Sequence, residues 1–238
     1  MRHDPAVDDD SDPVAFGPGQ PGRFFAWWYG DASATGTPGP APAADAVDGL
    51  PAPLRAWHEL AAARRLPAPV QLEILDAETA WYDGEVLVVA SEQGGWLWGV
   101  DAARAEDPND DGGGDLPVLE RSQATGGVWT ATKETLTEFL WHAAVLEAVL
   151  GAPVARTAEL LDGDAVRVAA TRLRPVTVPW WTWPGQGHWL LAGDGVLVVV
   201  APDDPEPDGS PSGTYFALGA ARAPEAVAVL DGVGLAWS

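Results

Sequence analysis

The side chains that could do chemistry are few in this chain of 238 residues, and they lie far apart. Cysteine is absent, which excludes disulfides and thiolate metal sites and favours a reducing compartment. The four histidines, His3, His58, His142 and His188, lack the spacing of HExxH or of another metal-binding motif. We therefore expect no metal site.

Motifs of nucleotide binding and of hydrolysis are also missing from the sequence. No GxGxxG follows a predicted strand and opens a helix, and neither GxxxxGK[ST] nor GxSxG is present. If the chain were an enzyme, His188 would be the first candidate for a catalytic base, because it lies beside Trp189 after a glycine-rich turn. We expect instead a protein that is not an enzyme, with no cofactor.

The formal net charge of −22 is concentrated in three segments rich in Asp, Pro or Gly. Met1–Asp12, Glu106–Asp115 and Asp203–Asp208 contribute −4, −5 and −4, which together make −13. These segments are expected to be solvated loops or tails. Their charge either serves mainly solubility or creates an electrostatic field that attracts a basic partner protein. Nucleic acid is not expected as a ligand, because phosphate binding needs clustered basic residues and the chain has only 13 Lys and Arg.

No feature of the sequence predicts contact with a membrane. No apolar run reaches the ~18 residues that a membrane-spanning helix needs. The N-terminal segment is acidic and lacks the basic and then apolar pattern of a signal peptide. A cytoplasmic location is therefore expected.

Several helices are predicted from spacing and capping residues. Apolar residues recur at helical spacing from Leu50 to Ala61, and Thr135-Leu136-Thr137-Glu138 fits a capping box. The helix that follows this box is predicted to carry one apolar stripe and to end before Gly151. Shorter helices are predicted over 154–161 and 224–230, and a docked aromatic helix or strand over 23–29.

Short runs of β-branched and aromatic residues predict strands in both halves of the chain. Asp83-Gly84 and Gly193-Asp194-Gly195 are hairpin signals. The two hairpins resemble each other only as any two apolar hairpins do, so internal duplication is not favoured. The predicted strands are 79–82, 85–90, 96–101, 116–119, 128–130, 166–171, 188–192, 196–201, 214–218 and 234–237.

Trp96 and Trp98 are expected to share one face of a strand, since side chains alternate along a strand. Gln93 lies in the preceding turn. Two interpretations stay open for this group. Either both Trp side chains pack in the core and Gln93 satisfies backbone groups, or the turn helps to form a protein-binding rim. A further alternative is that segment 180–189, with Trp96 and Trp98, lines a pocket for a small molecule.

One series of motifs between residues 50 and 150 keeps a distinctive order. Its members are Leu50-Pro51 with Leu54, Glu92-Gln93-Gly94, Trp98-Gly99-Val100-Asp101, Asp115-Leu116-Pro117-Val118, Trp129 and Thr135-Leu136-Thr137-Glu138-Phe139-Leu140. This series resembles the SMI1/KNR4 (SUKH) family, especially its bacterial members. The chain departs from the family pattern at two points: it has Ser91-Glu92-Gln93 where the family commonly has Glu-Asn-Gln, and Asp115-Leu116-Pro117-Val118 where it often has Asp-Pro-Pro-Val.

The resemblance implies an α+β fold in which helices flank a central antiparallel or mixed sheet, with a β-rich C-terminal extension. The expected divisions are a mobile acidic N-terminus over 1–22, an aromatic segment and Ala/Pro/Gly linker over 23–49, an SMI1/KNR4-like core over 50–162, and an α+β extension over 163–238. The extension could belong to the same domain or form a small lobe.

The resemblance also implies a protein-binding module without catalytic residues. Many bacterial relatives are immunity proteins that neutralise toxins, often nucleases, and a basic toxin would suit the acidic charge. The alternative is a small-molecule-binding or regulatory protein with a Trp-lined pocket. The oligomeric state stays open. The residues expected to contact a partner are Glu92, Gln93, Trp96, Trp98, Asp101, Asp110, Asp111 and Asp115.

Overall fold

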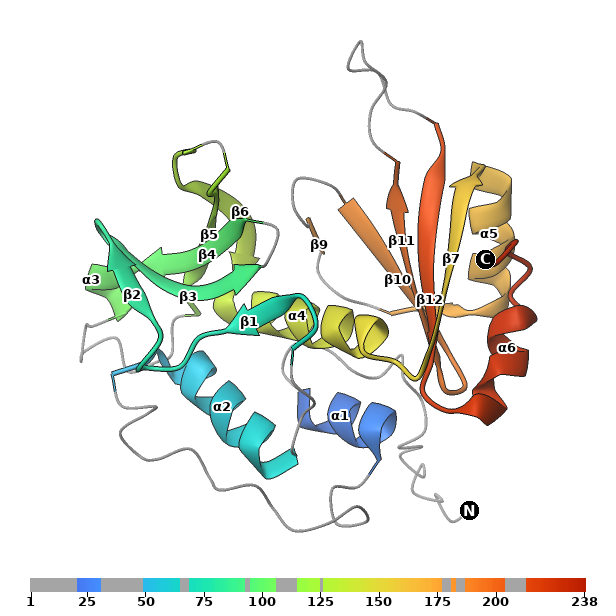
Figure 1. Cartoon of the computed structure of the whole chain (residues 1–238), viewed down its shortest axis with the longest axis horizontal. Helices are drawn as coiled ribbons and strands as arrows, with labels where there is room; N and C mark the ends of the chain where they lie inside the picture. Colours follow the sequence, from blue (N-terminus) through green and yellow to red (C-terminus); the bar gives the residue numbers. More distant parts are fainter. Residues whose placement is uncertain are drawn as a thin grey trace, which may run out of the picture.

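The computed structural model describes residues 21–30, 49–64, 69–92, 95–105, 115–124, 126–176, 181–182, 187–203 and 213–238. Within these ranges the chain forms two six-stranded antiparallel sheets and several helices, which confirms the α+β class. The helix α4 (Leu136–Leu150) runs between the two sheets, with the first sheet on the left of Figure 1 and the second on the right.

The first sheet is a meander that lies before α4 in the chain. Its strand order is β1-β3-β4-β5-β6, and the short strand β2 also pairs with β3. Gly84, with φ 64°, supplies the left-handed conformation in the turn of the β2–β3 hairpin, so this hairpin prediction is confirmed. The strands are β1 (Leu72–Ile74), β2 (Trp81–Asp83), β3 (Val86–Glu92), β4 (Trp96–Asp101), β5 (Pro117–Ser122) and β6 (Thr130–Thr135).

The second sheet follows α4 and has the order β7-β12-β11-β10-β8, with β9 also paired to β10. It thus shares one feature with the first sheet: a long strand, here β10 and there β3, is paired with two short strands. The predicted hairpin at Gly193-Asp194-Gly195 is confirmed. The strands are β7 (Val154–Leu161), β8 (Arg174–Pro175), β9 (Trp181–Thr182), β10 (Gly187–Gly193), β11 (Val196–Pro202) and β12 (Tyr215–Ala221).

The remaining helices cover the sheets from different sides. Helices α1 (Pro21–Tyr29) and α2 (Ala52–Arg64) lie beside α4, and α3 (Ala102–Ala105) follows β4. Helix α5 (Gly163–Arg172) lies on the face of the second sheet that is turned away from α4, with α6 (Val227–Asp231) beside it (Figure 1). A short 3-10 turn at Pro224–Ala226 leads into α6, as Pro at the start of a predicted helix suggests.

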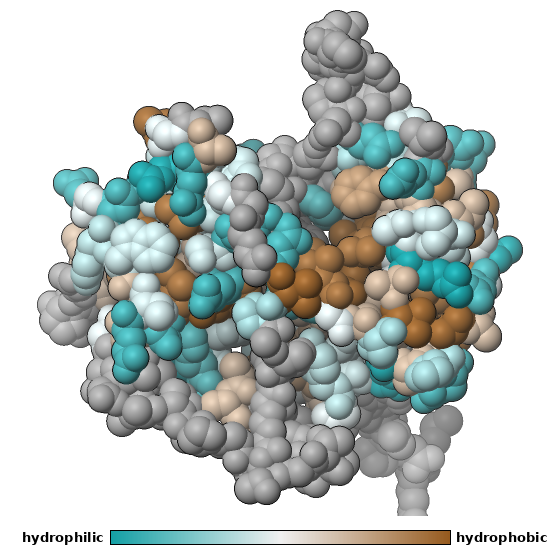
Figure 2. Space-filling view, in the orientation of Figure 1, coloured by the Kyte–Doolittle hydropathy of each residue, from teal (hydrophilic) through white to brown (hydrophobic). Residues whose placement is uncertain are grey.

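Helix α4 begins with the predicted capping box. The Thr135 hydroxyl accepts a hydrogen bond from the Glu138 amide, and the Glu138 carboxylate accepts one from the Thr135 amide at 2.9 Å. The prediction of a single apolar stripe is wrong, because the helix packs between two sheets and is buried on most sides. In Figure 2, apolar residues gather in the middle of the visible face, between these sheets.

The aromatic segment at 23–29 is a helix, α1, docked on the core. The ring of Phe24 packs edge-on against Trp141 of α4, with centroids 5.0 Å apart. Arg222, at the end of β12, donates a hydrogen bond to the Trp27 carbonyl and lies over the Trp27 ring. Helix α1 therefore connects the central helix to the second sheet.

In the second half of the chain, one segment predicted as a helix is a strand, and one predicted as a strand is a helix. Residues 154–161, predicted as a helix, form strand β7, because they pair with β12 over most of their length. Residues 166–171, predicted as a strand, lie in α5, where the Asp162 side chain caps the helix by accepting from the Ala165 amide at 2.8 Å. Residues 234–237 form no strand, although the adjacent Ser238 exchanges two backbone hydrogen bonds with Thr157.

Candidate functional site

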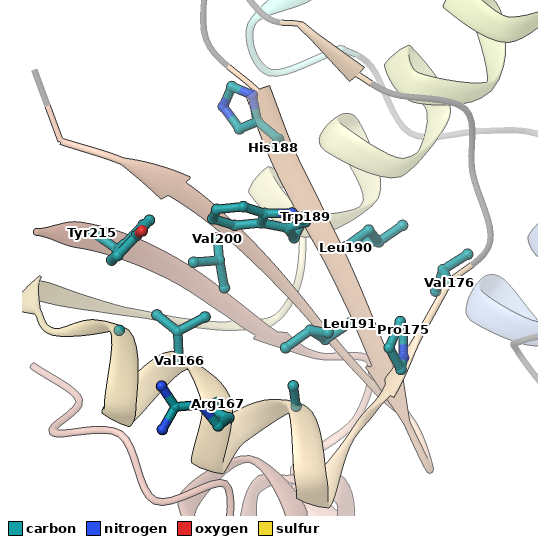
Figure 3. A pocket seen from close by; sticks show the side chains of 12 residues that line it. Val166, Arg167, Pro175, Val176, His188, Trp189, Leu190, Leu191, Val200 and Tyr215 are labelled. Carbon is teal, nitrogen blue, oxygen red and sulfur yellow. The ribbon is translucent and has the colours of Figure 1, made fainter. Parts of the chain in front are cut away.

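A pocket of about 410 Å³ lies between α5 and the outer face of the second sheet (Figure 3). We call it the Trp189 pocket. The sheet contributes Trp189 and Leu191 from β10, Val200 from β11 and Tyr215 from β12, and α5 contributes Val166. In Figure 3 these five side chains converge on one space, while His188 stands at the end of β10.

The pocket has two structural causes. Side chains of β10 point alternately to the two faces of the sheet, and α5 carries small residues on the side that faces the sheet. Leu190 and Ala192 face α4 and belong to the main core, whereas Leu191 belongs to the separate core beneath α5 and α6. Helix α5 presents Gly163 and Ala170 to the pocket, and such small side chains leave space between helix and sheet that larger ones would fill.

One wall of the pocket is an aromatic pair. The rings of Trp189 and Tyr215 have centroids 5.5 Å apart and an interplanar angle of 54°. Trp189 is 41% exposed, which is high for so large an apolar side chain on a sheet that is otherwise well covered. An exposed ring beside a cavity is available to pack against a bound molecule.

Few polar groups reach the Trp189 pocket. Among the described lining residues they are the side chains of Arg167, His188 and Tyr215 and the indole of Trp189, whose N–H is a donor. Arg167 is exposed and pairs with Asp164 at 2.6 Å on the same helix. The described lining residues include no carboxylate and no serine or threonine.

The sequence pointed to part of this pocket. Segment 180–189 was considered as a pocket wall, and Trp189 is one. Trp96 and Trp98, proposed for the same wall, lie in the first sheet and contribute nothing to it. The sequence does not predict the contribution of α5, because the residue types at 166–171 favour a strand. The Asp162 cap, followed by small residues at helical spacing, was the signal that could have revealed it.

The structure describes five of the eight residues expected to contact a partner, and these lie at several places along the first sheet and its connections. Glu92 ends β3 and accepts from the Gln71 side chain at 2.5 Å, and Trp96 is half-buried against the main core. Asp101 is exposed and accepts from the Arg104 amide at the start of α3. Asp115 accepts from the Thr137 amide at 2.9 Å, at the first turn of α4. Gln93, Asp110 and Asp111 lie outside the described residues.

The expectation that Trp98 contacts a partner does not fit the structure. Trp98 is only 2% exposed, and its ring packs on Phe139 of α4 with centroids 5.6 Å apart. Trp96 and Trp98 do share one face of β4, and both pack against the main core. The packing of the two Trp side chains agrees with the alternative that places them in the core, while its second part, the role of Gln93, lies outside the described residues.

A cluster of buried ionisable groups lies where β5 and β6 pack on α4. The Glu134 carboxylate is 2.5 Å from His142 Nδ1, and both side chains are almost completely buried. Burial raises the pKa of Glu134, although the hydrogen bond from His142 opposes the shift. Burial and the nearby charge of Glu134 also raise the pKa of Glu120, against a hydrogen bond from the Trp98 indole.

These raised pKa values predict how stability depends on pH. A carboxyl whose pKa is higher in the folded than in the unfolded chain stabilises the fold fully below its unfolded pKa of about 4.3, and this contribution is lost as the pH rises through the folded pKa. Glu134→Gln, which cannot ionise, should therefore gain stability relative to the wild type as the pH rises. Urea unfolding at a series of pH values measures this difference, and Glu120→Gln should show the same sign. A difference that does not change with pH would contradict the assignment.

The described part of the chain shows no metal centre. No three His, Asp or Glu side chains gather there as metal ligands. No helix in those ranges has the length and apolar character needed to cross a membrane. Comparisons of the chain with models of known families, with curated proteins and with solved structures gave no match.

Proposed function

We propose that this chain is a non-enzymatic binding protein whose Trp189 pocket takes up a small, largely apolar molecule. The observation that carries this proposal is the pocket itself, a cavity of about 410 Å³ lined mainly by aliphatic and aromatic side chains. Its volume falls within the range of roughly 300–1,000 Å³ that is typical of small-molecule sites. Its few polar groups suit orientation of a ligand better than catalysis.

The lining defines the chemistry of a suitable ligand. A flat or branched apolar body would pack between the Trp189–Tyr215 pair and the aliphatic side chains of Val166, Leu191 and Val200. Burial of apolar surface supplies the affinity, at roughly 25 cal/mol per Å². The guanidinium of Arg167 can only donate hydrogen bonds, so it favours an acceptor group at the α5 end of the ligand.

N-phenyl-1-naphthylamine is a suitable probe, because it is neutral, apolar and fluorescent in apolar surroundings. We expect it to bind the wild-type protein with one saturable site at this pocket. Ala170→Phe places a ring in the pocket from α5 and should weaken binding about 10-fold or more, since this corresponds to the loss of only ~1.4 kcal/mol. A fluorescence titration measures both affinities.

Thr171→Phe is the matched control for this experiment. It adds the same ring to the same helix at an exposed position that does not line the pocket. It should leave the affinity for the probe unchanged. Equal binding by wild type and a folded Ala170→Phe variant, or no binding by the folded wild type, would overturn the proposal.

A second candidate function is the binding of a protein partner. The resemblance to the SMI1/KNR4 family and the net charge of −22 support an immunity protein that neutralises a basic toxin in the cytoplasm. One structural feature favours a partner: Trp81 and Tyr82 on β2 are 41% and 56% exposed, and aromatic side chains are frequent binding hot spots.

Co-purification with the product of the adjacent reading frame tests this second function. A complex with a basic, toxic neighbour that dissociates at high salt would support it. The variant Trp81→Ala/Tyr82→Ala should then bind more weakly than wild type while remaining folded. Failure of a toxic neighbour to bind at either salt concentration would count against the immunity role and leave the pocket proposal untouched.

A further inference from the structure

A second, smaller pocket lies on the other side of the molecule from α5. It has a volume of about 280 Å³ and is formed by α1, α2, β1 and α4. We call it the Tyr29 pocket. It shares no lining residue with the Trp189 pocket. Its lining includes three aromatic residues, Phe25, Tyr29 and Trp57, together with His58 and Glu147.

The three aromatic rings of the Tyr29 pocket differ in orientation. Phe25 lies between the other two: its centroid is 6.1 Å from that of Tyr29 at an interplanar angle of 33°, and 5.6 Å from that of Trp57 at 64°. Phe25 is only 1% exposed and packs against both neighbouring rings, whereas Tyr29 and Trp57 are partly exposed and offer ring surface to the pocket. The electron-rich faces of such rings attract cations, and groups of them bind quaternary ammonium ions.

The pocket also holds one fixed negative charge. The Glu147 carboxylate accepts hydrogen bonds from three successive backbone amides, those of Val70, Gln71 and Leu72, the last at 2.7 Å. These neutral donors hold the carboxylate in place but do not cancel its charge. Among the lining residues that the structure describes, there is no Lys or Arg.

The Glu147 carboxylate lies close enough to Tyr29 to affect the pKa of its hydroxyl. Burial raises the pKa of the Tyr29 hydroxyl to about 12, and the Glu147 carboxylate adds to the shift. The phenol therefore stays neutral at physiological pH and adds a ring without adding a second negative charge. Tyr29 is 37% exposed, so one wall of the pocket is accessible from solvent.

We propose that the Tyr29 pocket binds a small organic cation with a methylated ammonium group, which packs against the rings of Tyr29 and Trp57 and whose charge Glu147 balances. A methylated ammonium is weakly hydrated and can enter an aromatic site without the desolvation penalty that a bare ammonium would incur. The volume of about 280 Å³ suits a small metabolite. The net charge of −22 raises the local concentration of cations around the chain.

The test compares choline with 3,3-dimethylbutan-1-ol, its neutral isostere, by isothermal titration calorimetry. The two molecules have nearly the same shape, so their difference isolates the positive charge. We expect choline to bind the full chain at least ~10-fold more tightly than the isostere. Free Nε-trimethyllysine, as a third ligand, shows whether the preferred group comes from a small alcohol or from a modified lysine. Equal binding of choline and isostere, or no choline binding at millimolar concentration, would overturn the proposal.

Variants locate the binding in the Tyr29 pocket. Glu147→Gln removes the charge but keeps an oxygen that accepts from the backbone amides, and it should weaken choline binding about 5-fold or more. Glu73→Gln is the matched control, because it removes an exposed carboxylate from the same strand as Leu72 without touching the pocket. If Glu147→Gln is unstable, Tyr29→Leu is used as the pocket variant, because its position is partly exposed and should tolerate the change. A folded pocket variant that binds choline as well as Glu73→Gln does would refute the site.

Discussion

Replacement of Trp98 by alanine is expected to lower the free energy of unfolding by about 3–5 kcal/mol, the usual cost of truncating a large buried aromatic side chain. Trp98 is 2% exposed, packs on Phe139 and bonds the Glu120 carboxylate through its indole. The truncation would leave a cavity between β4 and α4 and remove the hydrogen bond from a partly buried carboxylate. Urea unfolding followed by far-UV circular dichroism measures this loss.

Trp96→Ala is the control for this prediction. Trp96 lies on the same strand and the same face, but it is half-buried, so solvent can fill more of the space that its truncation leaves. Its loss of stability should be clearly smaller. If the two variants lost the same stability, the central role of Trp98 in the core would be contradicted. The experiment also separates folding from recognition, because a residue as buried as Trp98 can affect a partner only through the fold.

Replacement of His142 by leucine is expected to cost about 3 kcal/mol, because it leaves the buried Glu134 carboxyl without its hydrogen-bond partner. The imidazole is 2.5 Å from the Glu134 carboxylate, and the side chains are 2% and 3% exposed. Leucine has a similar size, so little cavity forms, and the cost arises because the carboxylate loses its partner. The cost should shrink at acidic pH, since protonation of Glu134 removes its charge.

The double variant Glu134→Leu/His142→Leu provides the decisive comparison. It removes both members of the pair and fills the space with apolar atoms, a change that is often neutral or even stabilising in other proteins. It should therefore lose much less stability than the sum of the two single variants. A double-mutant cycle in urea measures the coupling. Additive losses would show that the two side chains do not stabilise each other.

Most elements near the middle of the chain could be predicted because their signals are local. The capping box of Thr135 and Glu138 joins residues three apart, and the hairpin turns depend on adjacent residues such as Asp194 and Gly195. The shared face of Trp96 and Trp98 follows from strand alternation alone. Each of these features needs no knowledge of the rest of the chain.

The secondary-structure predictions are wrong where contacts between distant parts of the chain outweigh the local preference of a segment for helix or strand. The mixed polar and apolar segment 154–161 is compatible with either a helix or a strand, and its pairing with β12 decides for the strand. Helix α4 has more than one buried face because a second sheet, formed by later residues, packs against it. No window of sequence around α4 contains that information.

By itself, the sequence determined the α+β class, the capped central helix, the two hairpins, the absence of cysteine chemistry and the strongly acidic charge. Only the tertiary structure decided where the pockets lie, because each is made from elements far apart in the chain. The Trp189 pocket needs α5 laid over β10 and β11, and the Tyr29 pocket needs α1 and α2 beside α4. The same holds for the pairing of Glu134 with His142, which depends on β6 packing against α4. Periodicity and capping act over a few residues, whereas cavities and buried pairs depend on how whole elements pack.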